Sequence, residues 1–214
     1  MAEVEAKVSE NVMEACARTE SVRKCVLTSS LLACIWRNGT QSELPPVIDH
    51  SCWSDESLCV DKKLWYALGK LKAEKTAWKI AEAKGLKLST ICPALITTPN
   101  LLYHHPTPTI AYLKGAHEMY ANGLLATVDV DNLAKAHVRV YEAMQKAVYG
   151  RYVCFDKVIS TEYEAEELSE QTGFSLEKIR GDNKYGGSTA PFRLSDRKLS
   201  SLLSRSSICC LDDI

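Results

Sequence analysis

The sequence lacks the features that assign a chain to a membrane, a disulfide scaffold or a metal site. No window reaches the 18 or more apolar residues of a membrane span. The nine cysteines are scattered, odd in number and without a C-x-x-C pair, so we interpret them as reduced core thiols and expect no metal. Residues 1–10 are charged and lack the apolar core of a signal peptide. We therefore expect a soluble, cytoplasmic protein that does not associate with a membrane.

An excess of charge of either sign is missing too. The 26 basic and 27 acidic side chains give a formal net charge of −1, so the sequence has no electrostatic footprint for a nucleic acid. A chain of 214 residues can bury one full core, or form one domain with a small appendage.

A glycine-rich turn is the most telling absence. The ten glycines, of which Gly39 is the first, form neither G-x-G-x-x-G nor G-x-x-G-x-x-G. Such a turn usually binds the pyrophosphate of a dinucleotide between the first strand and the first helix of an α/β domain. The sequence therefore provides no recognisable phosphate-binding half for a dinucleotide.

The pattern that is present alternates helices and strands. Polar, proline-containing stretches at 37–61 and 97–108 indicate loops, and the pair His104-His105 has no third ligand spaced with it. The strand–helix–strand order around residues 66–84 predicts a crossover between parallel neighbours. We expect helices over residues 11–19, 66–84, 109–122, 131–146, 162–172 and 195–204, and strands over 24–29, 86–92 and 150–155.

Four polar side chains suggest chemistry. Tyr66 and Lys70 are four residues apart in the longest predicted helix, so both can contact one ligand. Ser29 and Ser30 follow a predicted buried strand, at the end of a parallel sheet where active-site groups gather. An ammonium beside a phenol lowers the pKa of the phenol, and a serine hydroxyl can orient a carbonyl. A lone Y-x-x-x-K match is weak, because a half-buried tyrosine and a solvated lysine explain an isolated match better than a catalytic pair does.

Many sequence blocks in the same order strengthen the functional interpretation. Together they resemble plant cinnamoyl-CoA reductases and dihydroflavonol reductases, which are extended short-chain dehydrogenase/reductases. The similarity runs from about residue 8 to residue 156. The blocks are Asn11–Cys16, Thr28–Ser30, Ser51–Asp55, Trp65–Lys70, Ala73–Trp78, Thr90–Ile96, Val128–Asp131, Ala136–Glu142 and Gly150–Cys154.

The resemblance implies a role for each matching residue. Ser30 matches the catalytic serine, Tyr66 the proton donor, and Lys70 the lysine that lowers the tyrosine pKa and binds the nicotinamide ribose. The segment that lines the nicotinamide matches Pro93, Ala94, Leu95 and Ile96. In this family NADPH delivers a hydride to a thioester or ketone, so the resemblance implies NADP(H) as cofactor and a small phenylpropanoid-type substrate.

The resemblance also implies the fold, an α/β partial Rossmann-type doubly wound parallel sheet with a small C-terminal α+β cap. The first strands and the glycine-rich turn of the family are missing, which indicates an N-terminally truncated member. We assign residues 1–106 to the C-terminal half of the NAD(P)-binding domain, with the catalytic residues. Residues 107–214 would form the substrate-side cap, interleaved with the sheet.

Three hypotheses remain open on the sequence. The first is an NADP-dependent reductase of the cinnamoyl-CoA reductase-like type, impaired by truncation. The second is a catalytically silent fragment that associates with another protein through an exposed sheet edge. The third is an NAD(P)-dependent epimerase or dehydratase, because the same tyrosine and lysine serve those reactions.

Overall fold

A parallel sheet forms the centre of the protein. In the computed structural model, which describes residues 2–37, 47–98, 106–181 and 191–206, three strands pair in the order β1-β3-β6. These are β1 (Lys24–Thr28), β3 (Lys87–Pro93) and β6 (Gly150–Cys154), and both pairings are parallel. The α/β fold with a parallel sheet is thereby confirmed, as are all three predicted strands.

Two smaller sheets extend this framework. The first has the order β4-β5-β7, with β4 (Leu95–Thr97), β5 (Ala126–Asp129) and β7 (Lys157–Val158). In the second, β2 (Val47–Ile48) pairs in parallel with β8 (Arg193–Leu194). The sequence interpretation missed all five of these strands, because segments of two to four residues carry too little periodicity to be recognised.

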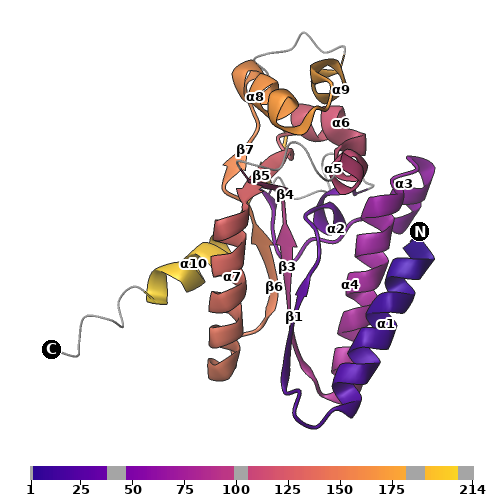
Figure 1. Ribbon diagram of the computed structural model, residues 1–214, viewed down its shortest axis with the longest axis vertical. Helices are drawn as coiled ribbons and strands as arrows, with labels where there is room; N and C mark the ends of the chain where they lie inside the picture. Colours follow the sequence, from indigo (N-terminus) through magenta and orange to yellow (C-terminus); the bar gives the residue numbers. More distant parts are fainter. Residues whose placement is uncertain (1, 38–46, 99–105, 182–190, 207–214) are drawn as a thin grey trace, which may run out of the picture.

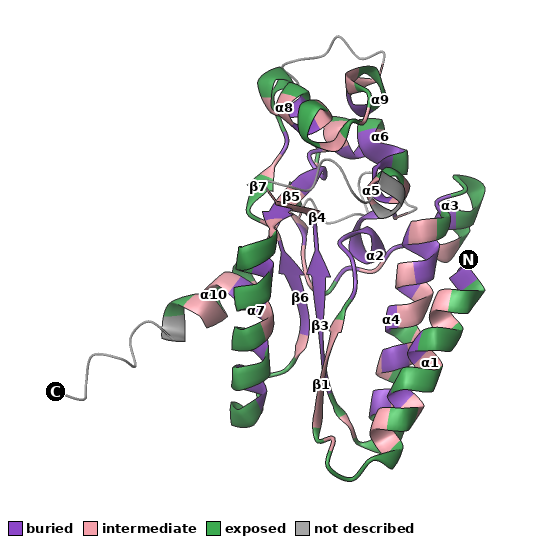
Figure 2. Cartoon of the chain, in the orientation of Figure 1, coloured by how far each residue is buried: buried purple, intermediate pink, exposed green. Residues whose placement is uncertain are grey.

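Helices cover both sides of the central sheet (Figure 1). One layer consists of α1 (Ala2–Arg18) and α4 (Trp65–Lys84), and the other contains α7 (Val130–Ala143) and α10 (Arg197–Ser206). Burial follows this arrangement. In Figure 2, β3 and β6 are largely purple, the edge strand β1 is mostly pink, and the outward faces of the helices are largely green. The predicted helix over residues 11–19 is the second half of the longer α1.

The end of the molecule beyond the carboxyl ends of β1 and β3 is capped by short helices (Figure 1). They are α5 (Pro106–Tyr112), α6 (Ala116–Ala121), α8 (Glu162–Thr172) and α9 (Leu176–Arg180). The expected single helix over 109–122 is wrong in detail, because a 3₁₀ turn at Leu113–Gly115 divides it. A second 3₁₀ turn, Met144–Lys146, ends the predicted helix over 131–146.

The stretch 37–61 is more ordered than a loop. It holds β2 and also α3 (Glu56–Asp61), while α2 (Leu32–Ile35) lies just before it. The Asp55 side chain begins α3 by accepting hydrogen bonds from the backbone N–H groups of Ser57 and Leu58. Residues 38–46, and likewise the pair His104-His105, lie outside the described residues.

Helices α1 and α4 run in parallel and pack closely along their length. Glu3 pairs with Lys72 at 2.7 Å, and the Ser9 hydroxyl, six residues further along α1, donates to the Ala73 carbonyl at 2.8 Å. The helix α4 ends at Gly85, whose φ of 65° suits a residue without a side chain. This packing places the residues of α4 at fixed positions against the sheet.

The proposed division at residue 106 stays a prediction. The strand β6 comes from the second part of the chain, yet it pairs with β3 of the first part. Thus the two parts share one sheet.

Gly115 offers a test of the cap packing. Its missing Cβ would lie 2.4 Å from the Cη2 atom of Trp36, which is 4% exposed. We expect Gly115→Ala to lower the free energy of unfolding by about 1–3 kcal/mol, because the added methyl overpacks the core. In a urea-denaturation cycle, Trp36→Phe should recover part of the loss. Equal losses in the Gly115→Ala variant with and without Trp36→Phe would contradict this contact.

Candidate active site

The predicted site residues line one cavity of about 400 Å³. It opens where β1 and β3 end and where α4 begins, below the cap. Ser30, Tyr66, Lys70 and the whole segment from Pro93 to Ile96 contribute to its wall. The structure therefore brings together every residue that the sequence indicated for catalysis and cofactor binding. The other lining residues are Thr28, Ser29, Thr109 and Tyr112.

Backbone pairing fixes Ser30 at the mouth of the sheet. The ladder between β1 and β3 continues past the strand end, because Ser29 N–H donates to the Ile91 carbonyl at 2.7 Å and Leu31 N–H to the Pro93 carbonyl at 2.8 Å. The Ser30 hydroxyl accepts a hydrogen bond of 3.2 Å from the N–H of Leu32, the first residue of α2. Ser30 is only 2% exposed, so its hydroxyl is held in one place.

Tyr66 and Lys70 lie one helical turn apart on α4. The Lys70 Nζ atom is 5.6 Å from the centroid of the Tyr66 ring. Burial raises the pKa of Tyr66 above its ordinary value, and the negative charge of Glu5 raises it further. The sequence analysis expected Lys70 to lower the pKa of Tyr66, but the pKa is raised. The reason is that burial disfavours the phenolate and a carboxylate lies close by.

Glu5 reaches this site from α1. Its carboxylate forms an ion pair with Lys70 at 3.6 Å, and both side chains are just over one quarter exposed. The sequence analysis gave no sign of this contact, since it depends on how α1 lies against α4. Hydrophobic periodicity predicts that two helices pack, but it does not predict their register.

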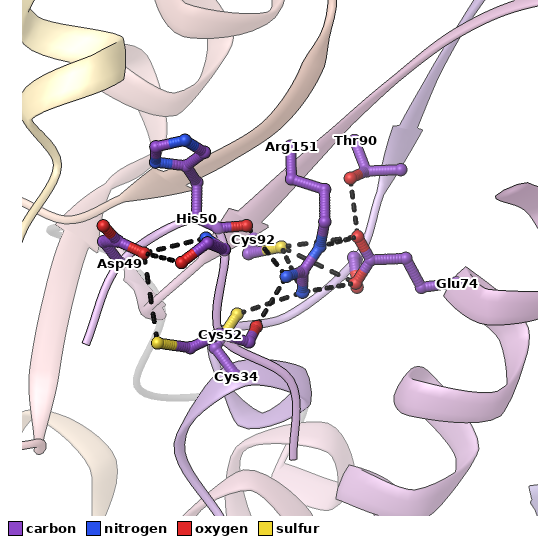
Figure 3. A network of polar contacts seen from close by, with 10 residues as sticks. Cys34, Asp49, His50, Cys52, Glu74, Thr90, Cys92 and Arg151 are labelled. Atoms are coloured by element: carbon purple, nitrogen blue, oxygen red, sulfur yellow. Dashed lines mark hydrogen bonds and ion pairs between the residues drawn. The ribbon is translucent and has the colours of Figure 1, made fainter. Parts of the chain in front are cut away.

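The buried carboxylate of Glu74 binds the segment that carries Ser29 and Ser30. Glu74 is fully buried and accepts hydrogen bonds from the hydroxyls of Ser29 at 2.7 Å and Thr90 at 2.6 Å. Because Ser29 immediately precedes Ser30, Glu74 links the end of β1 to α4 and β3. Figure 3 shows Glu74 with Thr90 and Arg151.

Arg151 of β6 completes this network. Its Nε atom donates to Glu74 at 2.8 Å, and its Nη1 atom donates to the carbonyls of His50 at 2.9 Å and Cys52 at 2.5 Å (Figure 3). The guanidinium also stacks on Trp53 at 3.5 Å. The ion pair is therefore compensated by several hydrogen bonds, as a buried charge requires.

The sequence analysis missed both members of this ion pair, although the sequence places each at a position where a charged side chain is unusual. Glu74 lies four residues after Lys70, on the buried side of α4, and Arg151 stands in a strand that is otherwise apolar. Charged residues at inward positions are rarely unpaired. Their partners could not be predicted, because they are 77 residues apart in sequence.

His137 behaves as a packing residue. Its Nε2 atom lies 2.8 Å from the Thr28 hydroxyl, and its Nδ1 atom lies 2.8 Å from the Leu133 carbonyl. Both ring nitrogens therefore have hydrogen-bond partners within the chain, as expected of a packing residue.

The cysteines of the described ranges are free thiols, and five of the seven are buried. A hydrogen bond with Cys34, together with burial, holds the pKa of Cys92 well above its usual value. Cys92 is therefore a neutral thiol at neutral pH. Within the same ranges, no cluster of three histidine, cysteine or acidic side chains could hold a metal ion, and no helix is long and apolar enough to cross a bilayer.

The donor set of the cavity fits the nicotinamide end of a dinucleotide. Tyr66 and Lys70 present hydrogen-bonding groups suited to a ribose diol, and Pro93–Ile96 present a mainly apolar wall to a ring. A cavity of about 400 Å³ suits this end of the cofactor better than the whole molecule.

Comparison with known proteins finds relatives among plant reductases. The chain is 38% identical to cinnamoyl-CoA reductase 1 of Petunia hybrida over 157 residues, covering 71% of this chain and 45% of that protein. It is 35% identical to tetraketide alpha-pyrone reductase 1 of Arabidopsis thaliana over 156 residues, covering 71% of this chain and 47% of that protein. The chain thus spans about half the length of these curated relatives. No family-level sequence profile matches it.

Solved structures show the same fold. Vestitone reductase from alfalfa (Medicago sativa) superposes with a TM-score of 0.59 at 22% identity, covering 94% of this chain and 66% of that one. A UDP-N-acetylglucosamine 4-epimerase from Bacillus cereus superposes with a TM-score of 0.56 at 16% identity, covering 94% and 67%. The fold is therefore that of the Rossmann-like short-chain dehydrogenase/reductases. Within this class, the sequence matches place the chain in the plant cinnamoyl-CoA reductase-like family, a family of oxidoreductases.

The ion pair between Glu74 and Arg151 predicts a large effect on stability. Arg151→Met leaves a buried carboxylate without its counter-charge, so we expect the free energy of unfolding to fall by about 3–5 kcal/mol in urea denaturation. The matched control is Arg139→Met, whose partner Glu142 is half exposed, and its cost should stay below about 1 kcal/mol. Glu74→Gln combined with Arg151→Met should cost less than the sum of the single changes. Similar losses for the two arginine variants would contradict the role of burial.

Proposed function

We propose that this chain carries the catalytic half of an NADP-dependent reductase that acts on the carbonyl of a small molecule. The observation that supports the proposal most directly is the shared cavity. Ser30 follows β1 and lies 36 positions before Tyr66 of α4, yet Ser30, Tyr66 and Lys70 all line the same 400 Å³ space beside Pro93–Ile96.

Each side chain has a role that its position suits. When bound, NADPH supplies the hydride. We assign to Ser30 a hydrogen bond that orients the substrate carbonyl, and to Tyr66 the transfer of a proton to the carbonyl oxygen. Lys70 would bind the ribose hydroxyls with its ammonium. Because its pKa is raised, Tyr66 is protonated at neutral pH, which suits a proton donor in the direction of reduction.

We further propose a phenylpropanoid-type thioester or ketone as the substrate. The cavity wall is mainly apolar and includes Tyr112, which is 5% exposed, so it suits a flat aromatic molecule. The names of the related reductases support the same class, since they act on cinnamoyl-CoA or tetraketide α-pyrones.

A second candidate function is association through the open edge of the sheet. The strand β1 is an edge strand, and beside it a groove of about 290 Å³ is lined by apolar side chains of α1. Val4, Val8 and Val12 recur at helical spacing and are 64%, 55% and 54% exposed. A partner that adds a parallel strand to β1 would cover this surface.

An epimerase or dehydratase is the third candidate, on the same Tyr66 and Lys70. It has the weaker support, because the epimerases share only the fold with this chain. Product analysis distinguishes the candidates. A reductase releases NADP⁺ and a reduced product, whereas an epimerase returns an isomer and regenerates its cofactor.

Turnover gives the first test. We expect the chain to oxidise NADPH with a cinnamoyl-CoA thioester, an aldehyde or a dihydroflavonol, and Tyr66→Phe to reduce the rate by about 10²–10⁴-fold, because the proton donor is lost. Tyr163→Phe is the matched control, since Tyr163 is 72% exposed on α8. Absence of NADPH oxidation with all three substrates would favour the catalytically silent protein that binds through β1.

Cofactor binding gives the second test. In calorimetric titration, NADPH should bind with micromolar affinity, and Lys70→Met should weaken it by about tenfold, because a charge-assisted hydrogen bond is lost. Lys75→Met is the control, since Lys75 follows on the same helix and pairs with Glu56 at 2.9 Å, away from the cavity. Failure to detect heat at millimolar NADPH would contradict a competent cofactor site.

A further inference from the structure

Lys70 lies between two cavities. On one side is the 400 Å³ space that it shares with Tyr66, and on the other is the 290 Å³ groove along α1. Thr28, Ser29 and Lys70 line both spaces, so they form the wall between them. The ammonium can therefore bind a group on either side.

The group on the α1 side is Glu5. Its carboxylate lies 3.6 Å from the Lys70 ammonium, and it fills space left by Gly69. A Cβ atom on Gly69 would lie 3.0 Å from the carboxyl carbon of Glu5. The absence of a side chain at this position thus allows the carboxylate to approach the first turn of α4, next to both Lys70 and Tyr66.

We infer that Glu5 is a positioning residue that restrains Lys70, an inference that rests on the proposed function. Its carboxylate holds the ammonium on the α1 side of the wall and opposes negative charge on Tyr66. A ligand in the main cavity must then compete with Glu5 for the N–H donors of Lys70. Glu5 would therefore limit both the affinity for the cofactor and the acidity of the proton donor.

The other charged groups around the site are engaged elsewhere. Glu3 pairs with Lys72 at 2.7 Å, and Glu74 pairs with Arg151 at 2.8 Å. From α3, Glu56 pairs with Lys75 at 2.9 Å. On the cap side the phenol of Tyr112 lines the cavity, and burial raises its pKa so far that it stays neutral. Among the described residues, Glu5 is the acidic group whose charge raises the pKa of Tyr66.

Two matched variants separate Glu5 from the general charge of α1. Glu5→Gln removes the carboxylate beside Lys70. Glu3→Gln removes a different carboxylate of the same helix, and its partner Lys72 does not line the main cavity. In chains with ¹³C-labelled tyrosine, the Tyr66 resonance is identified by its loss in Tyr66→Phe. Its titration midpoint should fall in Glu5→Gln and stay unchanged in Glu3→Gln. Circular dichroism at each pH checks that the chain stays folded.

Two further measurements are made at neutral pH. The Lys70 Cε resonance should move in Glu5→Gln but not in Glu3→Gln, and this result decides the inference even if alkaline pH unfolds the chain. Calorimetric affinity for NADPH should rise about two- to fivefold in Glu5→Gln only, the range expected from a partly exposed ion pair.

Unchanged Tyr66 and Lys70 signals in Glu5→Gln would overturn the inference, and so would equal changes in both variants. If the signals move as expected but NADPH does not bind to any form, the contact between Glu5 and Lys70 stands and the proposed reductase function fails.

Discussion

The site depends on one buried ion pair. Glu74 joins α4 to β1 through Ser29 and to β3 through Thr90, while Arg151 brings β6 to the same point. Two charges away from water are costly unless they are paired and fully hydrogen-bonded, so this pair is satisfied in only one arrangement of these four elements. That arrangement is the one that places Ser30 opposite Tyr66. The polar network thus fixes the geometry that apolar packing alone leaves adjustable.

Much of the candidate site could be predicted because its parts are local. Tyr66 and Lys70 are related by one helical turn, and Ser30 follows a strand whose apolar run marks its end. Parallel strands end at the same edge of a sheet, so Ser30 and Pro93 had to lie near each other once β1 and β3 were recognised. The resemblance in sequence then gave these positions a chemical interpretation that spacing alone did not support.

Other features could not be predicted, because they depend on long-range register. The contact of Glu5 with Lys70 requires the exact axial position of α1 on α4, and the pairing of β2 with β8 joins residues about 146 positions apart. The division of residues 109–122 has a more local cause. Gly115 packs against Trp36, and the 3₁₀ turn brings that glycine to the ring.

The electrostatics of the cavity follow from these long-range contacts. A tyrosine and a lysine four residues apart suggest a lowered phenol pKa, but the surrounding fold determines the net effect. Burial by the cap raises the pKa of Tyr66, and the carboxylate of Glu5 acts in the same direction while it pairs with the cation that would oppose it. The environment thus keeps Tyr66 protonated and therefore able to donate. A ligand that covers the cavity and draws Lys70 away from Glu5 would change both the burial of the phenol and the charge beside it, so binding and proton transfer are coupled through the same lysine.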